Sequence, residues 1–183
     1  MIDCHVASHT PRNDSGYFMK LFRIILLALL ALLLTLLDVA FFSNLPVYGA
    51  TIIVTFLVAV IFSLDNKWEN LIIFSSFAFL FYSIFSSVSV PILFFVFYIL
   101  PFAIHYLRKN YFRDTSAIFS IAYFAPALLI FDLSLMIATK QWGTEAILAL
   151  CYFVLINSVF GVIIYAPVLR LRRALTLEKE IKI

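Results

Sequence analysis

The sequence predicts an all-α integral membrane protein, a compact bundle of six transmembrane helices. Three observations predict this class. Hydrophobic residues fill 64% of the 183 positions, charged residues fill only 13%, and the apolar residues form long runs between short polar connectors. A soluble domain is about half apolar and about a quarter charged. A single core could not hide this much apolar surface from water, so we expect the chain to lie in a membrane.

The apolar runs set the number of spans, because a helix needs about 20 predominantly apolar residues to cross the hydrocarbon layer. Short connectors make neighbouring helices antiparallel. One helix over the third and fourth spans would be too long for a single crossing. We therefore expect the turn at residues 86–91 to separate them. We expect the spans at residues 21–42, 46–64, 71–88, 89–107, 115–138 and 146–168.

The ends of the chain differ in composition from the spans. Residues 1–18 are polar and show no apolar pattern, so we expect a disordered segment, and Met19 just before the first span is a second possible start. Residues 19–173 form the six-helix transmembrane domain in this interpretation. Residues 174–183 form a charged cytoplasmic tail.

The basic residues predict the orientation. With six spans, both termini lie on one side, and 12 of the 13 lysines and arginines fall on that side. Lys140 alone falls on the other side. Positively charged loops stay in the cytoplasm. We therefore expect a multi-pass protein of the bacterial inner (cytoplasmic) membrane with both termini cytoplasmic.

Polar side chains inside or beside the spans are the candidates for function, because an ionisable group in lipid is costly. Asp38 lies near the outer end of the first span and Asp132 in the outer half of the fifth, while Glu145 precedes the sixth. These carboxyl groups could line an outward cavity for a cation or a substrate. They could equally be interfacial carboxylates near water, with Lys140 as a local partner.

Asn157 is an amide in the middle of the last span, "YFVLINSVFGVIIYAPVLRLRR". An amide in this position can bond to a neighbouring helix, which stabilises membrane bundles by about 0.6–2 kcal/mol. It could also contact a ligand. We favour the first role, in which Asn157 joins two helices.

Several function classes lack any supporting motif. The chain has no HExxH, no GxSxG and no P-loop. Its two cysteines, Cys4 and Cys151, match neither a disulfide framework nor a zinc site. There is no basic stripe for nucleic acid. We expect no enzymatic activity, no cofactor, no metal and no nucleic-acid partner.

The overall plan resembles the rod shape-determining protein family MreD, whose members are short inner-membrane proteins with almost no extramembrane domain. Three stretches carry the likeness: "FFSNLPVYGATIIVTFLVAVIF", "FDLSLMIATKQWGTEAILAL" and "INSVFGVIIYAPVLRLRR". The last is similar to the family's final helix in Asn157, in Tyr165-x-Pro167 and in its basic end. The chain departs from the family at Val47, where members often carry an acidic residue.

This resemblance implies a non-enzymatic scaffold of the cell-elongation machinery, with no catalytic residues. It implies a single-span partner like MreC, with the MreB filament and the peptidoglycan synthases nearby and membrane lipids around the helices. The alternative is a substrate-binding S component of an energy-coupling-factor vitamin transporter. Such a protein needs a polar outer pocket, which Asp38, Asp132, Trp142 and Glu145 could furnish.

Overall fold

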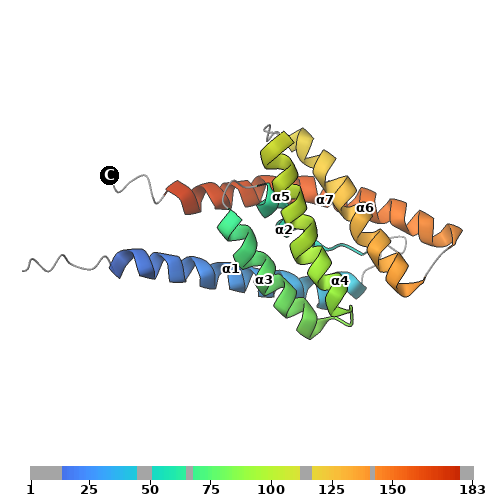
Figure 1. The fold of residues 1–183 in the computed structure, drawn as a ribbon, viewed down its shortest axis with the longest axis horizontal. Coiled ribbons are helices and arrows are strands. Elements are labelled where there is room, and N and C mark those ends of the chain that lie inside the picture. The colour runs from blue at the N-terminus through green and yellow to red at the C-terminus, as the bar shows by residue number, and fades with distance from the viewer. Residues whose placement is uncertain (1–13, 45–50, 65–67, 112–116, 141–142, 178–183) are drawn as a thin grey trace, which may run out of the picture.

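A computed structural model of the chain describes residues 14–44, 51–64, 68–111, 117–140 and 143–177. Within these ranges the chain is helical and contains no strand, which confirms the all-α class for the described part. Each of the six segments predicted to be a span contains a helix. Figure 1 shows the start of α1 and the end of α7 at the same end of the molecule.

The first helix, α1 (Asp14–Ala40), is rich in leucine and alanine, which are strong helix formers. A short 3₁₀ turn, η1 (Phe42–Asn44), follows it. Leu27, Ala31 and Thr35 are buried at helical spacing, whereas Leu33 between them is 61% exposed. The helix therefore buries one stripe and leaves a broad apolar face outside.

The third helix, α3 (Trp68–Phe85), packs along that stripe. Its buried residues include Ser75 and Ala78, which are as small as Ala31 and Thr35 on α1. Small side chains let helix backbones approach closely where the surroundings offer no hydrophobic driving force. Among the described residues, the pair α1–α3 makes one of the two most extensive helix contacts.

The second helix, α2 (Val54–Ser63), corrects the prediction of a full-length span at residues 46–64. It has 10 residues and follows non-helical residues at 51–53. At 1.5 Å per residue it is about 15 Å long, roughly half the hydrocarbon thickness. The β-branched residues at 51–53 have a low helix propensity, and side chains of other helices bond to their non-helical backbone.

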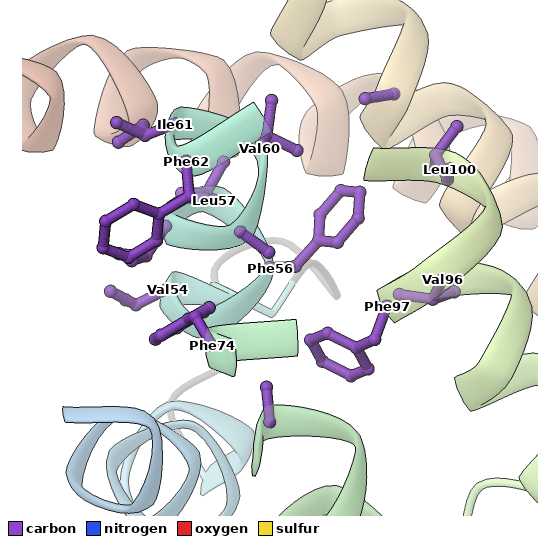
Figure 2. Packing of buried hydrophobic residues seen from close by; sticks show 14 of the residues in the cluster. Val54, Phe56, Leu57, Val60, Ile61, Phe62, Phe74, Val96, Phe97 and Leu100 are labelled. Atoms are coloured by element: carbon purple, nitrogen blue, oxygen red, sulfur yellow. The ribbon is translucent and has the colours of Figure 1, made fainter. Parts of the chain in front are cut away.

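All ten residues of α2 are buried. Figure 2 shows Phe56, Leu57 and Val60 of α2 surrounded by side chains of the neighbouring helices. Phe62 packs on Phe74 of α3 with ring centroids 5.1 Å apart, and Phe56 packs on Phe131 with centroids 5.0 Å apart. A helix that is apolar on all sides belongs in the centre of a bundle, and α2 is that centre.

The fourth segment is one helix in three parts. These are α4 (Val90–Phe94), a π-helical turn η2 (Phe95–Ile99) and α5 (Leu100–Tyr111). Residues 86–89 form the turn from α3 that the sequence predicts. Pro91 lies in the first turn, where its missing N–H is harmless. Pro101 follows the π turn. The ring of a proline clashes with the preceding turn of a regular α-helix, so an irregular turn before Pro101 is expected.

The last two helices, α6 (Ala117–Thr139) and α7 (Thr144–Leu177), pack against each other as a hairpin. Phe131 stacks on Phe153 with centroids 5.8 Å apart. A Cβ atom added to Gly161 would lie 3.2 Å from the Phe124 ring, so this glycine permits the close approach.

The ends of the first and last helices extend beyond the predicted domain. The α1 helix begins at Asp14, inside the segment 1–18 predicted to be disordered. The α7 helix continues to Leu177, four residues into the predicted tail at 174–183. Leucine, alanine and arginine dominate the end of α7, and these strong helix formers explain the continuation.

Four helices are long and apolar enough to cross a membrane, which indicates a membrane protein. They cover Phe18–Asn44, Trp68–Phe85, Val90–Asn110 and Thr144–Tyr165. Two shorter apolar helices, Val54–Ser63 and Tyr123–Ile137, complete the described bundle. The outward side chains of the long helices are also apolar, as Leu155 and Ile163 of α7 illustrate at 63% exposure each. An apolar exterior of this kind suits a lipid environment.

The close packing of α6 on α7 leads to a testable prediction. Gly161→Leu should lower the free energy of unfolding by about 1–3 kcal/mol, because the new side chain must displace the buried Phe124 ring. Thermal unfolding in mild detergent would measure the loss. The matched control is Gly143→Leu, since nothing lies within 4 Å of a Cβ atom there. Equal losses in both variants would contradict the packing.

Candidate functional site

The carboxyl group of Asp38 holds the start of α2. Its Oδ1 accepts the backbone N–H of Val54 at 2.9 Å, and its Oδ2 accepts the N–H of Thr55 at 2.9 Å. The hydroxyl of Tyr82 on α3 donates to the same Oδ2 at 2.7 Å. Asp38 is only 5% exposed. One carboxyl group therefore joins α1, α2 and α3 inside the bundle.

The side chain of Asn157 on α7 holds the residues just before α2. Its Oδ1 accepts the N–H of Ile53 at 2.9 Å, and its Nδ2 donates to the carbonyl of Thr51 at 2.9 Å. The same Nδ2 donates to Phe153 of its own helix at 3.0 Å. Asn157 is fully buried. Its amide thus joins α7 to the non-helical backbone that leads into α2.

These two side chains provide hydrogen-bond acceptors for the buried N-terminus of α2. The first N–H groups of any α-helix lack partners within the helix, and an unpartnered buried N–H destabilises a fold by about 1–3 kcal/mol. The residue that precedes α2 is Ile53, whose side chain cannot accept a hydrogen bond. Asp38 and Asn157 supply the acceptors from other helices instead. The positive end of the α2 dipole also favours a carboxylate at this place.

The other end of α2 receives donors from α5. His105 Nδ1 lies 3.0 Å from the carbonyl oxygen of Ser63. Since a carbonyl only accepts, Nδ1 carries the proton in this contact. The guanidinium of Arg108 donates to the carbonyl of Leu64, and Arg108 is buried. Cationic groups are favourable at a helix C-terminus, so both ends of α2 carry complementary partners.

A third polar contact joins the third turn of α1 to the first turn of α3. Arg23 Nε donates to the Asn70 side chain at 2.6 Å, and its Nη1 lies 3.3 Å from a Glu69 oxygen. The Glu69 side chain is 64% exposed, so this ion pair contributes little stability. The contact shows that the start of α3 lies beside the N-terminal half of α1.

The structure brings together two of the five predicted site residues. Asp38 on α1 and Asn157 on α7 both bond to the backbone at the beginning of α2. Asp132 is half-buried on α6, and Glu145 is exposed in the first turn of α7. The partners of Asp38 lie on α2 and α3, so its carboxyl is bonded to neither. Trp142 lies outside the described residues.

Sequence reasoning missed Tyr82, His105 and Arg108 as parts of this arrangement. His105 and Arg108 are three residues apart and so share one helix face, which was the available signal. Tyr82 gives none, because one tyrosine among nine in a phenylalanine-rich chain carries no distinguishing pattern.

The chemistry that this arrangement offers is structural. The side chains of Asp38, Asn157, His105 and Arg108 all contact the backbone at the two ends of α2. Among the described residues, no three histidine, cysteine, aspartate or glutamate side chains lie close enough to hold a metal ion. No protein-family model, curated protein or solved structure matches the chain.

The bonds of Asp38 predict that its two oxygens cannot be replaced. Asp38→Asn keeps the shape but turns one acceptor into a donor, which would face a buried N–H or the Tyr82 hydroxyl. We expect the free energy of unfolding to fall by about 1–3 kcal/mol, measured by chemical unfolding in detergent. Asp132→Asn is the matched control, and it should change stability little. A harmless Asp38→Asn would show that the carboxyl does not hold α2.

The amide of Asn157 should matter less. Asn157→Leu should insert normally and lose about 1 kcal/mol of stability, because interhelical polar contacts in membranes are individually modest. The same unfolding measurement applies. Ser158→Ala on the next position is a suitable control, since the Ser158 hydroxyl is buried without a hydrogen-bond partner. Normal folding with loss of the protein's cellular role would instead favour a ligand contact for Asn157.

Proposed function

We propose that the chain is a multi-pass protein of the bacterial cytoplasmic membrane whose six helical segments leave both termini in the cytoplasm. The four long apolar helices support the membrane location. The distribution of positive charge supports the orientation. Arg23 contacts the first turn of α3, and Arg108 contacts the end of α2, which precedes α3 in the chain. Lys140 follows the far end of α6.

This orientation can be tested by a reporter fused after Ile183 that is active only in the periplasm. Six segments with the positive residues inside predict no reporter activity. The same reporter fused after Lys140 is the matched control and should be active. Strong activity after Ile183 would overturn the proposed topology.

Within the membrane, the proposed function is that of a scaffold that binds a single-span protein. One observation carries this proposal: the deeply buried side chains Asp38 and Asn157 bond to the backbone at the start of α2 and just before it. The polar interior therefore serves to hold a helix, and the surface that remains for function consists of helix faces. A partner must meet the protein there, because the connectors between helices are short.

The resemblance to the MreD family gives this scaffold a cellular setting. The partner in that setting is an MreC-like single-span protein, and MreB filaments and peptidoglycan synthases lie nearby in the cell-elongation machinery. A rigid bundle suits such a role, because it presents fixed helix faces to its partner.

The vitamin-transporter alternative depends on a polar outer pocket. A broken helix with its N-terminus inside the bundle is a feature of transporters, where the free N–H groups meet an anionic substrate group. In this chain Asp38 and Asn157 already occupy the N–H groups of residues 53–55. Asp38 is thereby used within the fold, which favours the scaffold over the transporter.

The scaffold and the transporter predict different binding behaviour. The purified chain in mild detergent should retain a co-expressed MreC-like single-span protein through size-exclusion chromatography. A single-span protein of unrelated function is the control and should separate. The same preparation should show no thermal shift with a panel of vitamins. Marked stabilisation by one vitamin, lost in Asp132→Ala or Trp142→Ala, would overturn the scaffold proposal.

A further inference from the structure

Two threonine hydroxyls close to Asp38 are buried in the bundle. Thr35 lies three residues before Asp38 on α1, and Thr55 is the second residue of α2. Both threonines are fully buried. Among the residues that the structure describes, neither hydroxyl has a hydrogen-bond partner. A hydroxyl without a partner in an apolar interior is costly, so these two groups require an explanation.

Serine hydroxyls elsewhere in the chain find a partner within their own helix. Ser63 donates to the carbonyl of Val60 at 2.6 Å, and Ser134 donates to the carbonyl of Ile130 at 2.7 Å. This bond to the preceding turn is the usual local solution for serine and threonine in a helix. The two threonines beside Asp38 do not use it, so their partner must come from outside their own helices.

The fold places both hydroxyls beside one carboxyl group. Thr55 donates its backbone N–H to Asp38 Oδ2 at 2.9 Å. Its side chain lies near the Asp38 carboxyl and the Tyr82 hydroxyl, although its own hydroxyl forms no hydrogen bond with either. Thr35 and Asp38 are three residues apart, so their side chains are neighbours on the same face of α1. The two threonines therefore flank Asp38 from two different helices.

The hydrogen-bonding capacity of this cluster is only partly used. An ionised carboxyl group has about four acceptor sites, and three donors already occupy Asp38: the N–H groups of Val54 and Thr55 and the hydroxyl of Tyr82. Each threonine hydroxyl can donate one bond and also accept. The cluster thus offers one acceptor site on the carboxyl and two hydroxyls that act as donor or acceptor.

A water molecule matches these groups better than a cation does. A buried water makes about three hydrogen bonds to polar groups that otherwise lack partners. A cation at the same place would meet the N–H groups of residues 54 and 55 and the positive end of the α2 dipole. The three donors on Asp38 already favour its negative charge without a counter-ion.

We infer that Thr35, Thr55 and the Asp38 carboxyl bind one water molecule inside the bundle, between α1 and α2. The water donates to the free acceptor site of the carboxyl and joins the two threonine hydroxyls. The contact between α1 and α2 then depends on a bound solvent molecule as well as on the direct bonds of Asp38. This site belongs to the interior and does not rest on the proposed scaffold function.

Solid-state NMR of the unmodified protein in phosphatidylcholine vesicles tests for this water directly. Magnetisation should pass from water protons to the amide protons of Val54 and Thr55, which lie at the Asp38 carboxyl. Val60 is the internal control, because it is fully buried further along α2 and should receive none. The transfer should disappear in Thr35→Val. An absence of transfer in the wild type would overturn the inference.

Valine substitutions test whether the two hydroxyls share one ligand. Thr35→Val and Thr55→Val each replace a hydroxyl by a methyl group of the same shape. Each should lower the thermal midpoint in mild detergent by about 2–4 °C. The double variant should lose little more than one single variant, because both changes remove the same water. Single variants with an unchanged or raised midpoint would overturn the inference, as would losses that add.

Two controls separate a bound water from other causes. Ser63→Ala removes a hydroxyl that is bonded within α2, so its effect should add to that of Thr35→Val. The midpoint of the wild type should be equal in sodium chloride and in choline chloride at the same concentration. Stabilisation by sodium that Thr35→Val abolishes would overturn the water and indicate a bound cation instead.

Discussion

The structure depends on hydrogen bonds to the backbone groups at both ends of α2, a short helix that is buried on every side. The α2 helix contributes ten buried residues to the core, but both of its ends present backbone groups to an apolar interior. Water cannot reach those groups, so side chains must. Asp38 and Asn157 accept the first N–H groups, and His105 and Arg108 meet the last carbonyls. These four side chains come from three helices, α1, α5 and α7.

This arrangement explains how the outer helices are positioned. Asp38 fixes α1 and, through Tyr82, also α3, while Asn157 fixes α7 and Arg108 fixes α5. The ring of Tyr82 also packs on Phe97 with centroids 5.1 Å apart, so α3 contacts the π-helical turn η2. Polar bonds are directional, whereas contacts among leucines and phenylalanines are not. The few polar groups therefore specify where the many apolar side chains pack.

The use of polar groups inside the fold also bears on function. In a catalytic or transport site, several polar groups converge on an empty place where a substrate binds. In this chain Asp38, Asn157 and Arg108 converge on backbone, and the exposed surface of the long helices is largely apolar. This use of the polar interior supports the proposed scaffold function.

The sequence alone determined the all-helical class, the number and order of the helical segments, and the turn at 86–89, because apolar runs and short connectors are local patterns. It also identified Asp38 and Asn157 as unusual, because a polar residue in an apolar run is conspicuous by itself. It could not show that both residues serve the same helix, since they are 119 positions apart in the chain. Only the tertiary structure decided that α2 is a short central helix rather than a full span. The physical reason is that non-helical backbone at residues 51–53 can be buried only when distant side chains supply its hydrogen bonds.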